Sequence, residues 1–167
     1  MAFIDDLAFL LALLTAVACG LMGGLFFAFS NFVMQALARI HPEAGITAMQ
    51  SINRTVLNRW FLGLFMGTTG ACALLVLYAL STWEMPGTFF LLLGSLLYLL
   101  GNFAVTLACN VPRNNALARL DAGSPESVAP WRNYVEEWTR WNHVRTGTAL
   151  LAAAVMIVGM CLMLTVD

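Results

Sequence analysis

Two clusters of polar side chains adjoin long apolar segments of this 167-residue chain. The first cluster, residues 110–115, reads Asn-Val-Pro-Arg-Asn-Asn, and the second, residues 138–146, reads Trp-Thr-Arg-Trp-Asn-His-Val-Arg-Thr. A polar group in apolar surroundings must find a hydrogen-bond partner or water, because leaving it unpaired is costly. Polar residues concentrated beside membrane-length segments therefore indicate where a binding or catalytic site is expected.

The second cluster contains the side chains best suited to proton transfer. Histidine gains and loses a proton near neutral pH, and His143 is the histidine of this cluster. We therefore predict His143 as a general base. Arg145 is a fixed cation that can stabilise an oxyanion, so it is the second predicted catalytic residue. Two other roles remain open, because a histidine at a helix boundary can be structural and Arg145 can stack on Trp141, one turn away. The predicted substrate-binding residues supply amides and flat aromatic walls: Asn53, Asn110, Asn114, Asn115, Trp138, Trp141 and Asn142.

No metal site is predicted. His41 could join His143 only if the loops that carry them meet, and two histidines without a matching carboxylate or thiol pattern make a poor set of ligands. The cysteines lie in apolar segments, and no two are close in sequence, so zinc or thioredoxin-like chemistry finds no support. Buried thiols are expected at Cys19, Cys72, Cys109 and Cys161.

The composition indicates a membrane protein. Apolar residues make up 60% of the chain, charged residues only 10%, and the mean hydropathy is +0.81, whereas soluble domains are roughly half apolar and a quarter charged. Four uncharged stretches are each long enough for the roughly 20 residues that a helix needs to cross the hydrocarbon. They are residues 7–38, 60–83, 85–112 and 146–166. The predicted partners are membrane lipid and an apolar small molecule, without nucleic acid, and the sequence does not specify an oligomeric state.

The apolar runs are continuous rather than alternating, which favours helices over a β-barrel because a spanning segment must pair its own backbone groups. The predicted fold is all-α, a single domain of residues 1–167 that forms a four-transmembrane-helix bundle extending into the cytoplasm. The first segment lacks a basic start and is too long for a cleavable signal peptide, so it is expected to remain. The helices are predicted at about residues 5–40, 52–82, 86–120 and 130–165.

All eight basic residues are arginines, and they fall into two of the connections between helices. Three lie in the loop of residues 39–59 and five in the loop of residues 113–145, so these loops are predicted on one side of the membrane. Because basic residues are enriched on the cytoplasmic side, both loops are predicted to be cytoplasmic and both termini outside. The two polar clusters then lie on the cytoplasmic side.

An internal similarity is consistent with two related helical hairpins. Residues 36–40 read Ala-Leu-Ala-Arg-Ile and residues 116–120 read Ala-Leu-Ala-Arg-Leu, an offset of 80 residues. Two parallel repeats would produce this pattern, and so would chance, because matches rich in alanine and leucine arise easily. In this alignment Ser30 corresponds to Asn110.

Two features within the helices are predicted to affect packing. The pairs Gly20 with Gly24 and Gly63 with Gly67 have the small-residue spacing that lets neighbouring helices approach closely. Pro112 has no backbone N–H and disturbs the preceding turn, so the carbonyls near residue 108 are predicted to find partners in the amides of the asparagines that follow.

The chain resembles the DUF1772, or anthrone oxygenase-like, family of membrane proteins. The resemblance covers essentially the whole chain, and the stretches Asn110–Leu117 and Trp138–Thr146 are its most distinctive features. Residues 24–34 and 49–54 also carry it. It implies a four-helix membrane protein. For members of polyketide pathways it also implies the oxidation of anthrones to anthraquinones by O2, without a conventional organic cofactor.

From the resemblance we form the hypothesis of an oxidation with O2 as co-substrate and no cofactor. An apolar polycyclic phenol or ketone would enter from the bilayer, His143 would remove a proton, and Arg145 with neighbouring asparagines would stabilise the anion. The alternative is a non-catalytic membrane module that binds a quinone, a lipid or a partner subunit. Two departures from the family pattern, Gln35 where proline is common and Arg113 where leucine is common, bear on the choice of substrate.

Overall fold

A computed structural model describes residues 2–166, and this part of the chain forms helices and turns without a strand. The first long helix consists of α1 (Ala2–Ala28), the π-helical turn η1 (Phe29–Val33) and α2 (Met34–Arg39). It is followed by the shorter α3 (Pro42–Thr55) and by the second long helix, α4 (Arg59–Ser81). The third long helix combines α5 (Thr88–Tyr98), the π-helical η2 (Leu99–Ala104) and η3 (Thr106–Asn110), and α6 (Val111–Ala118). The fourth is α7 (Val128–Met163), between the short turns η4 (Pro125–Ser127) and η5 (Leu164–Val166).

Four helices are long and apolar enough to cross a membrane, which confirms the predicted all-α bundle. The candidate spans are Ile4–Arg39, Arg59–Ser81, Thr88–Ala118 and Pro125–Met163. Many large apolar side chains point outward, as expected of a surface that lies against lipid. α7 has 36 residues and is about 54 Å long at about 1.5 Å per residue, which exceeds a hydrocarbon core of about 30 Å. The protein is a multi-pass integral membrane protein whose bundle continues beyond the bilayer.

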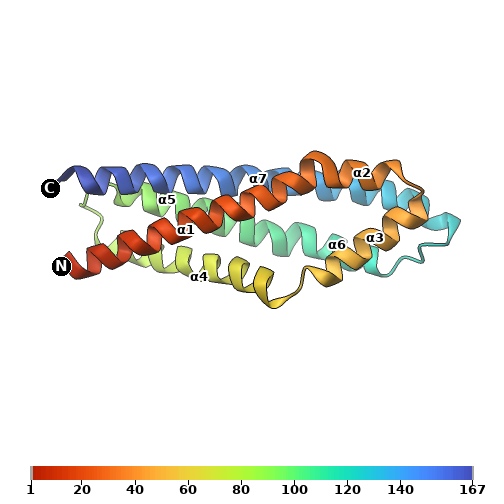
Figure 1. The fold of residues 1–167 in the computed structure, drawn as a ribbon, viewed down its shortest axis with the longest axis horizontal. Helices are drawn as coiled ribbons and strands as arrows, with labels where there is room; N and C mark the ends of the chain where they lie inside the picture. Colours follow the sequence, from red (N-terminus) through yellow and green to blue (C-terminus); the bar gives the residue numbers. More distant parts are fainter. Residues whose placement is uncertain (1, 167) are drawn as a thin grey trace.

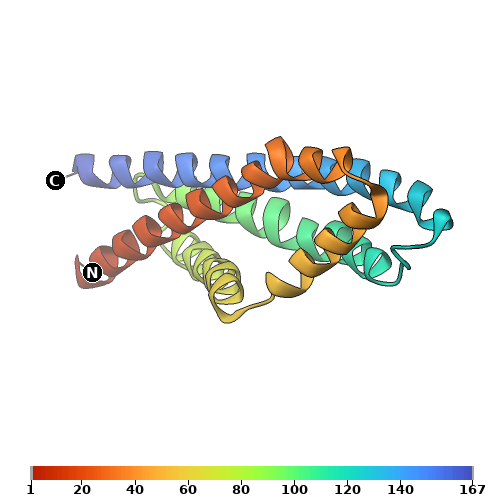
Figure 2. The same cartoon turned by 45° about the vertical axis from the view of Figure 1, so that its right-hand side comes forward.

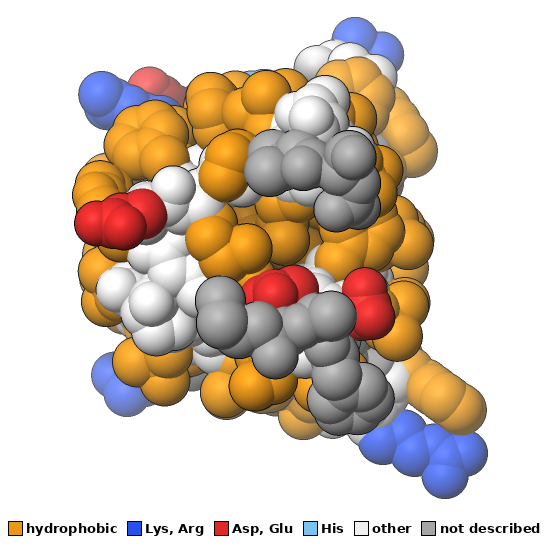
Figure 3. Space-filling view, turned by 90° about the vertical axis from the view of Figure 1, so that its left-hand side faces the viewer, with side chains coloured by type: hydrophobic (Ala, Val, Ile, Leu, Met, Phe, Trp, Pro, Cys, Tyr) orange, Lys and Arg blue, Asp and Glu red, His pale blue; other side chains and the backbone are white. Residues whose placement is uncertain are grey.

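Both termini lie at one end of the bundle, and both arginine-containing loops lie at the other (Figure 1). α7 runs along the whole bundle and packs against α1 and α5, and α4 also packs against α1 and α5 (Figure 2). The end with the termini presents acidic side chains among apolar ones (Figure 3). The two loops therefore lie on the same side, as the arginine pattern predicts.

The second long helix begins at Arg59, so its predicted start at residue 52 is wrong. Asn58 explains the break. Its Oδ1 accepts hydrogen bonds from the backbone N–H groups of Trp60 (3.0 Å) and Phe61 (3.1 Å), and its Nδ2 donates to the carbonyl of Thr55 (3.0 Å). One side chain thus caps both the start of α4 and the end of α3. Residues 52–55 belong to α3, an amphipathic helix that leads back from the loop end toward α4 (Figure 1).

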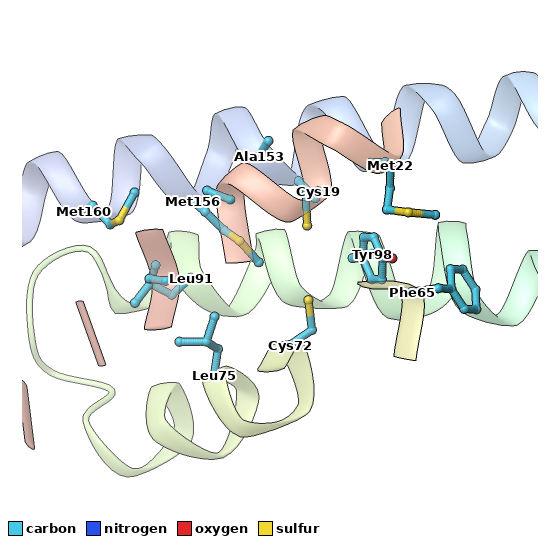
Figure 4. Packing of buried hydrophobic residues seen from close by; sticks show 14 of the residues in the cluster. Cys19, Met22, Phe65, Cys72, Leu75, Leu91, Tyr98, Ala153, Met156 and Met160 are labelled. Carbon is cyan, nitrogen blue, oxygen red and sulfur yellow. The ribbon is translucent and has the colours of Figure 1, made fainter. Parts of the chain in front are cut away.

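The core in the membrane-spanning part contains buried side chains from α1, α4, α5 and α7 (Figure 4). Cys19 and Cys72 are buried there, as predicted, and their sulfur atoms point toward one another from α1 and α4 (Figure 4). Cys109 is partly buried and Cys161 is exposed, so the prediction of a buried thiol is wrong for Cys161. An apolar residue type does not distinguish the core from the lipid-facing surface, because both are apolar.

The glycines at which helices approach closely are not the ones that were predicted to allow such contacts. A Cβ atom at Gly20, Gly24, Gly63 or Gly67 would meet no atom within 4 Å, so these residues do not bring helices together. At Gly101, by contrast, a Cβ atom would lie 2.3 Å from Cγ2 of Thr148 in α7. The prediction was wrong because small-residue spacing does not show which face of a helix meets a neighbour.

The two halves of the chain share an order of elements that agrees with the 80-residue offset. α2 ends at Arg39 and α6 ends at Ala118, within one residue of corresponding positions. In the first half, the chain then forms α3 and α4 with a break at residues 56–58. In the second half it forms α7 without a break. The break is the main difference between the halves, and the candidate site lies beside it.

Candidate functional site

A cavity of about 340 Å³ lies beside the break between α3 and α4. Its walls come from α1, α3, α4, the third long helix and α7. Most of the lining is apolar, with rings from Phe26, Phe29, Phe61 and Trp138. Small-molecule sites in proteins commonly have volumes of about 300–1,000 Å³, apolar walls and a few convergent polar groups. This cavity has the size and the lining of such a site.

The rim of the cavity combines exposed apolar and exposed polar side chains. Leu57, in the break between α3 and α4, is 64% exposed, and Leu25 and Val111 are also exposed. Arg54 and Asn115 add polar groups to the lining and are exposed as well. Such a rim suits a position where the hydrocarbon meets the polar membrane interface. An apolar ligand could therefore reach the cavity from the bilayer.

Arg145 is the buried charge of this cavity, with 5% of its surface exposed. Its guanidinium lies over the ring of Phe26 at 4.2 Å and over that of Trp138 at 5.2 Å, as in cation–π contacts. One terminal nitrogen donates to Thr106 Oγ1 (3.2 Å) and the other to Oδ1 of Asn142. Its Nε has no partner in the part of the chain that the structure describes.

Arg145 has no carboxylate partner in the described chain. The only ion pair between residues 2 and 166 joins Arg113 to Glu137, at 2.7 Å. A buried charge without a counter-ion costs several kcal/mol, because the protein replaces its hydration only in part. The site therefore favours a ligand that brings negative charge or an electron-rich oxygen to the guanidinium.

Asn142 holds Arg145 in place from behind the cavity. Its Nδ2 donates to the carbonyl of Phe26 (2.7 Å) and to Ser30 Oγ (2.6 Å), both in the first long helix. Its Oδ1 is then free to accept from Arg145, one turn further along α7. Asn142 is fully buried and is not part of the cavity lining. It acts on the site by fixing the position of Arg145.

A second network orients Asn53 and Asn114, two further asparagines of the cavity lining. Asn114 Oδ1 accepts hydrogen bonds from Trp138 Nε1 (2.8 Å) and from the Tyr134 hydroxyl (2.9 Å). Tyr134 in turn accepts from Asn53 Nδ2 of α3 (3.4 Å). Because the indole N–H can only donate, the Asn114 oxygen must face it. Both Asn53 and Asn114 line the cavity, and the network links three helices around it.

The π-helical turns keep the polar side chains of the third helix against α7. Asn102, Thr106 and Asn110 follow one another at intervals of four residues. In an α-helix, each such step would rotate the side chain by about 40°. The wider turns of η2 and η3 reduce this rotation. Asn102 Nδ2 thus reaches the carbonyl of Arg145 (3.2 Å), and Asn110 Nδ2 reaches that of Trp138 (3.3 Å).

The family model described as anthrone oxygenase matches residues 59–155, more than half of the chain. The chain belongs to the anthrone oxygenase family. The matched region runs from the start of α4 into α7 and contains Asn110, Asn114, Trp138 and Arg145. A search of curated proteins and a search of solved structures found no match. The walls that α1 and α3 add to the cavity lie outside the matched region.

Six of the nine site residues that were predicted from the sequence line the cavity: Asn53, Asn110, Asn114, Asn115, Trp138 and Arg145. Asn142 contacts Arg145 from behind. His143 and Trp141 are not part of the lining, and His143 is exposed. His41 is exposed at the start of α3 and is also outside the lining.

The placement of His143 follows from helix geometry. The buried face of α7 contains Trp131, Tyr134, Trp138, Asn142 and Arg145, at intervals of three and four residues. An α-helix turns by about 100° per residue, so the residues next to Asn142 point to its sides. The geometry therefore does not support His143 as a base for a ligand in this cavity, nor Trp141 as a wall.

Sequence reasoning missed several residues that build the site. Phe26 and Thr106 contact the guanidinium, Ser30 anchors Asn142, and Tyr134 orients Asn114. The regular spacing on α7 was the signal for Tyr134, and the 80-residue offset was the signal for Ser30, which aligns with Asn110. Phe26 gave no such signal, because one phenylalanine among many in a membrane segment is not distinctive.

The turn before Pro112 is stabilised by an arginine rather than by the predicted asparagines. Arg113 donates from Nη1 to the carbonyl of Cys109 (2.7 Å) and from Nε to Glu137 (2.9 Å). The charge that departs from the family pattern at this position is therefore engaged in contacts outside the cavity lining. No group of three or more His, Cys, Asp or Glu residues that could hold a metal ion occurs within residues 2–166.

Proposed function

We propose that this protein binds a flat, apolar phenol or aryl ketone in the cavity and promotes its oxidation by O2. The observation that carries the proposal is the buried Arg145 cation, which has no counter-ion in the described chain and lies between aromatic rings. A neutral ketone can enter an apolar cavity at little cost. Its enolate would then gain the Arg145 charge in a medium where electrostatic interactions are strong.

The reaction follows from the chemistry of such an enolate. An anthrone-type ketone loses a proton from its benzylic CH2 group, and the negative charge moves to the oxygen beside Arg145. The electron-rich ring carbon transfers an electron to O2 and combines with the resulting superoxide, which forms a C–O bond and a peroxide anion. The peroxide anion takes a proton from water, which replaces the proton lost in the first step, and becomes a hydroperoxide. The hydroperoxide then loses water and leaves a second carbonyl. One O2 is consumed, one oxygen atom enters the product, and the other leaves as water.

Proton removal in this proposal depends on Arg145 and water. The cavity lining contains neither a carboxylate nor a histidine. A cation next to the ligand oxygen favours the anionic form of the ligand, so it makes the benzylic proton more acidic. The proton passes to water at the exposed rim. His143 has no role in this scheme, in contrast to the expectation from sequence.

The arginine-rich end of the bundle is assigned to the cytoplasm, and both termini to the opposite side. The assignment is supported by the positive-inside bias, since all eight arginines lie within residues 39–59 and 113–145, the two stretches that contain the loops at that end. The cavity rim would then face the inner leaflet. An apolar substrate made in the cytoplasm or dissolved in the membrane could reach it.

The test is O2 uptake and product analysis with purified protein in nanodiscs and anthrone as substrate. Arg145→Gln is expected to lower the protein-dependent rate by about 100-fold or more, as for other groups that stabilise an oxyanion. Arg140→Gln is the matched control, because Arg140 is an exposed arginine on the same helix. His143→Ala is expected to keep the wild-type rate. Wild-type turnover in Arg145→Gln, or its loss in His143→Ala, would contradict the proposal.

The competing function is a non-catalytic membrane module that binds a quinone, a lipid or a partner subunit. It is favoured by the hydrogen bonds of Asn142, Thr106 and Asn114, since a buried polar network of this kind also locks helices together. This function predicts ligand binding without O2 uptake above the rate measured in nanodiscs that lack the protein.

A further inference from the structure

The uncompensated positive charge at the loop end of the bundle is concentrated in the first connection. Residues 39–59 contain three arginines and one glutamate, and all four are exposed. In residues 113–145, Arg145 is buried and Arg113 is paired with Glu137. The exposed arginines and exposed acidic residues that remain there are equal in number: Arg119, Arg132, Arg140, Asp121, Glu126 and Glu136. The excess of positive charge therefore belongs to the first connection.

Two of its arginines, Arg54 and Arg59, flank the break between α3 and α4, and the length of α4 gives the depth of this break in the membrane. α4 has 23 residues and is about 34 Å long at about 1.5 Å per residue, close to the hydrocarbon thickness of about 30 Å. Trp60 and Trp83, near its two ends, are 75% and 55% exposed, as expected of tryptophans at the membrane interface. Arg59 thus lies at the level of the lipid headgroups.

The chain turns sharply between these two arginines. The guanidinium of Arg59 lies over the ring of Trp60, 5.0 Å from the ring centroid. The N–H of Leu57 donates a hydrogen bond to the carbonyl of Arg54 (3.3 Å). Five extended residues span about 17 Å, so this turn brings Arg54 and Arg59 closer together than that. Neither forms an ion pair within residues 2–166.

An anionic phospholipid complements this surface in charge and in polarity. A guanidinium binds phosphate oxygens through its paired N–H groups. Leu57, between the two arginines, is 64% exposed and offers an apolar contact to an acyl chain. Each basic residue next to an anionic membrane surface strengthens the attraction by about 5-fold. A zwitterionic phospholipid has the same phosphate, but its own cation offsets the charge.

We propose that an anionic phospholipid binds at the break between α3 and α4, with its headgroup at Arg54 and Arg59 and an acyl chain along Leu57. Arg54 and Leu57 also belong to the cavity lining, so the bound lipid lies at the mouth of the cavity. This lipid site does not depend on which ligand the cavity takes or on whether that ligand is oxidised.

The test compares two lipids that differ in net charge. Binding of dioleoylphosphatidylglycerol and of dioleoylphosphatidylcholine to the purified full-length protein is titrated in detergent and followed by native mass spectrometry. Both probes have one phosphate and the same acyl chains. The wild type is expected to bind the first phosphatidylglycerol about 10-fold or more tightly than the first phosphatidylcholine. Equal affinities for the two lipids would overturn the proposal.

A pair of double variants locates the site. Arg54→Gln with Arg59→Gln is expected to lower the ratio of the two affinities by about 10-fold or more, and the ratio within one protein cancels general changes in lipid binding. Arg132→Gln with Arg140→Gln is the matched control, because it removes the same charge from exposed positions of α7, where Glu136 lies one turn from both. The control should keep the wild-type ratio. An unchanged ratio in the first variant, or an equal loss in the control, would refute this location.

Glycerol phosphate distinguishes a lipid site from a site for soluble phosphate esters. It carries the phosphate without acyl chains, so a 100-fold excess over phosphatidylglycerol is expected to leave the bound lipid in place. Displacement of the lipid at that excess would show that the arginines bind phosphate alone, and it would contradict the proposed role of Leu57 and the acyl chain.

Discussion

Replacing Asn142 tests whether the charge of Arg145 is what the cavity offers to a ligand. Asn142 makes three buried hydrogen bonds, to the carbonyl of Phe26, to Ser30 Oγ and from the Arg145 guanidinium. Asn142→Ala removes all three and leaves Thr106 as the one side chain of the described chain that still accepts a hydrogen bond from Arg145. We expect this variant to lose stability and ligand binding together.

The loss of stability follows from these three contacts. Hydrogen bonds between helices in membrane proteins contribute on average about 0.6 kcal/mol each. A hydrogen bond to a charged group contributes about 1.5–3 kcal/mol. Two neutral bonds and one charged bond therefore amount to about 3 kcal/mol, which corresponds to a change of roughly 150-fold in the unfolding equilibrium.

The variant Asn142→Asp separates the effect of lost bundle stability from the effect of neutralising the Arg145 charge. The carboxylate still accepts from Arg145 and adds a counter-ion in direct contact with the guanidinium, but it can no longer donate to Phe26 and Ser30. We expect a stability between those of the wild type and Asn142→Ala. Turnover should be at least as low as in Asn142→Ala, because an anionic ligand would meet a cation that is already neutralised.

Unfolding of the wild type and of every variant is followed by tryptophan fluorescence in the same detergent. Turnover is measured as O2 uptake with anthrone. Asn133→Ala is the control, because Asn133 is an exposed asparagine of the same helix, and its change in unfolding free energy should stay within about 0.5 kcal/mol. Wild-type turnover in Asn142→Asp would refute the role of Arg145 as the counter-charge. Wild-type stability in Asn142→Ala would show that the three hydrogen bonds do not hold α7 to the first helix.

Two further predictions concern the packing of helices and the attachment of α3, which lines the cavity. Gly101→Ala should destabilise the bundle by about 1–3 kcal/mol in the same unfolding assay, because its Cβ would overlap Thr148, whereas Gly67→Ala, with open space at that position, should not destabilise it. Gln50→Ala should speed amide hydrogen exchange in α3 by about 10-fold, because Gln50 Nε2 holds α3 to the end of α6 and to the turn after it, through the carbonyls of residues 117 (2.9 Å) and 120 (3.0 Å). Replacement of the exposed Gln35 is the control, and equal exchange in both variants would show that α3 is held by apolar packing alone.

The membrane-spanning architecture could be predicted because it depends on local properties of the chain. A helix in lipid satisfies its backbone within one segment, so a long uncharged run predicts a span without any knowledge of its neighbours. The helix boundary at Asn58 was harder to predict, because the helical sequence pattern continues across it. A single capping side chain ends one helix there and starts the next. The arginine pattern correctly placed both loops at one end of the bundle, since each hairpin must return to the side it left.

The candidate site could be predicted only in part. The asparagines and Arg145 were recognisable because polar groups are rare in membrane segments and must be paired. His143 and Trp141 were chosen for their side-chain chemistry, although both lie beside the buried face of α7 rather than on it. Phe26 and Gln50 were missed, because their importance comes from contacts with residues far away in the sequence.

The sequence by itself determined that this protein spans the membrane four times and that its polar clusters lie at one end. Both conclusions follow from hydrophobicity and charge along the chain, which act before any helix meets another. Only the tertiary structure decided which polar side chains share a cavity. The π-helical turns rotate Asn102, Thr106 and Asn110 toward α7, and the break at Asn58 lets α3 cover the space beside them. Arg145 becomes a buried cation without a counter-ion only when α1 and α7 bring Asn142 and the two rings together around it, because no single segment can desolvate a charge alone.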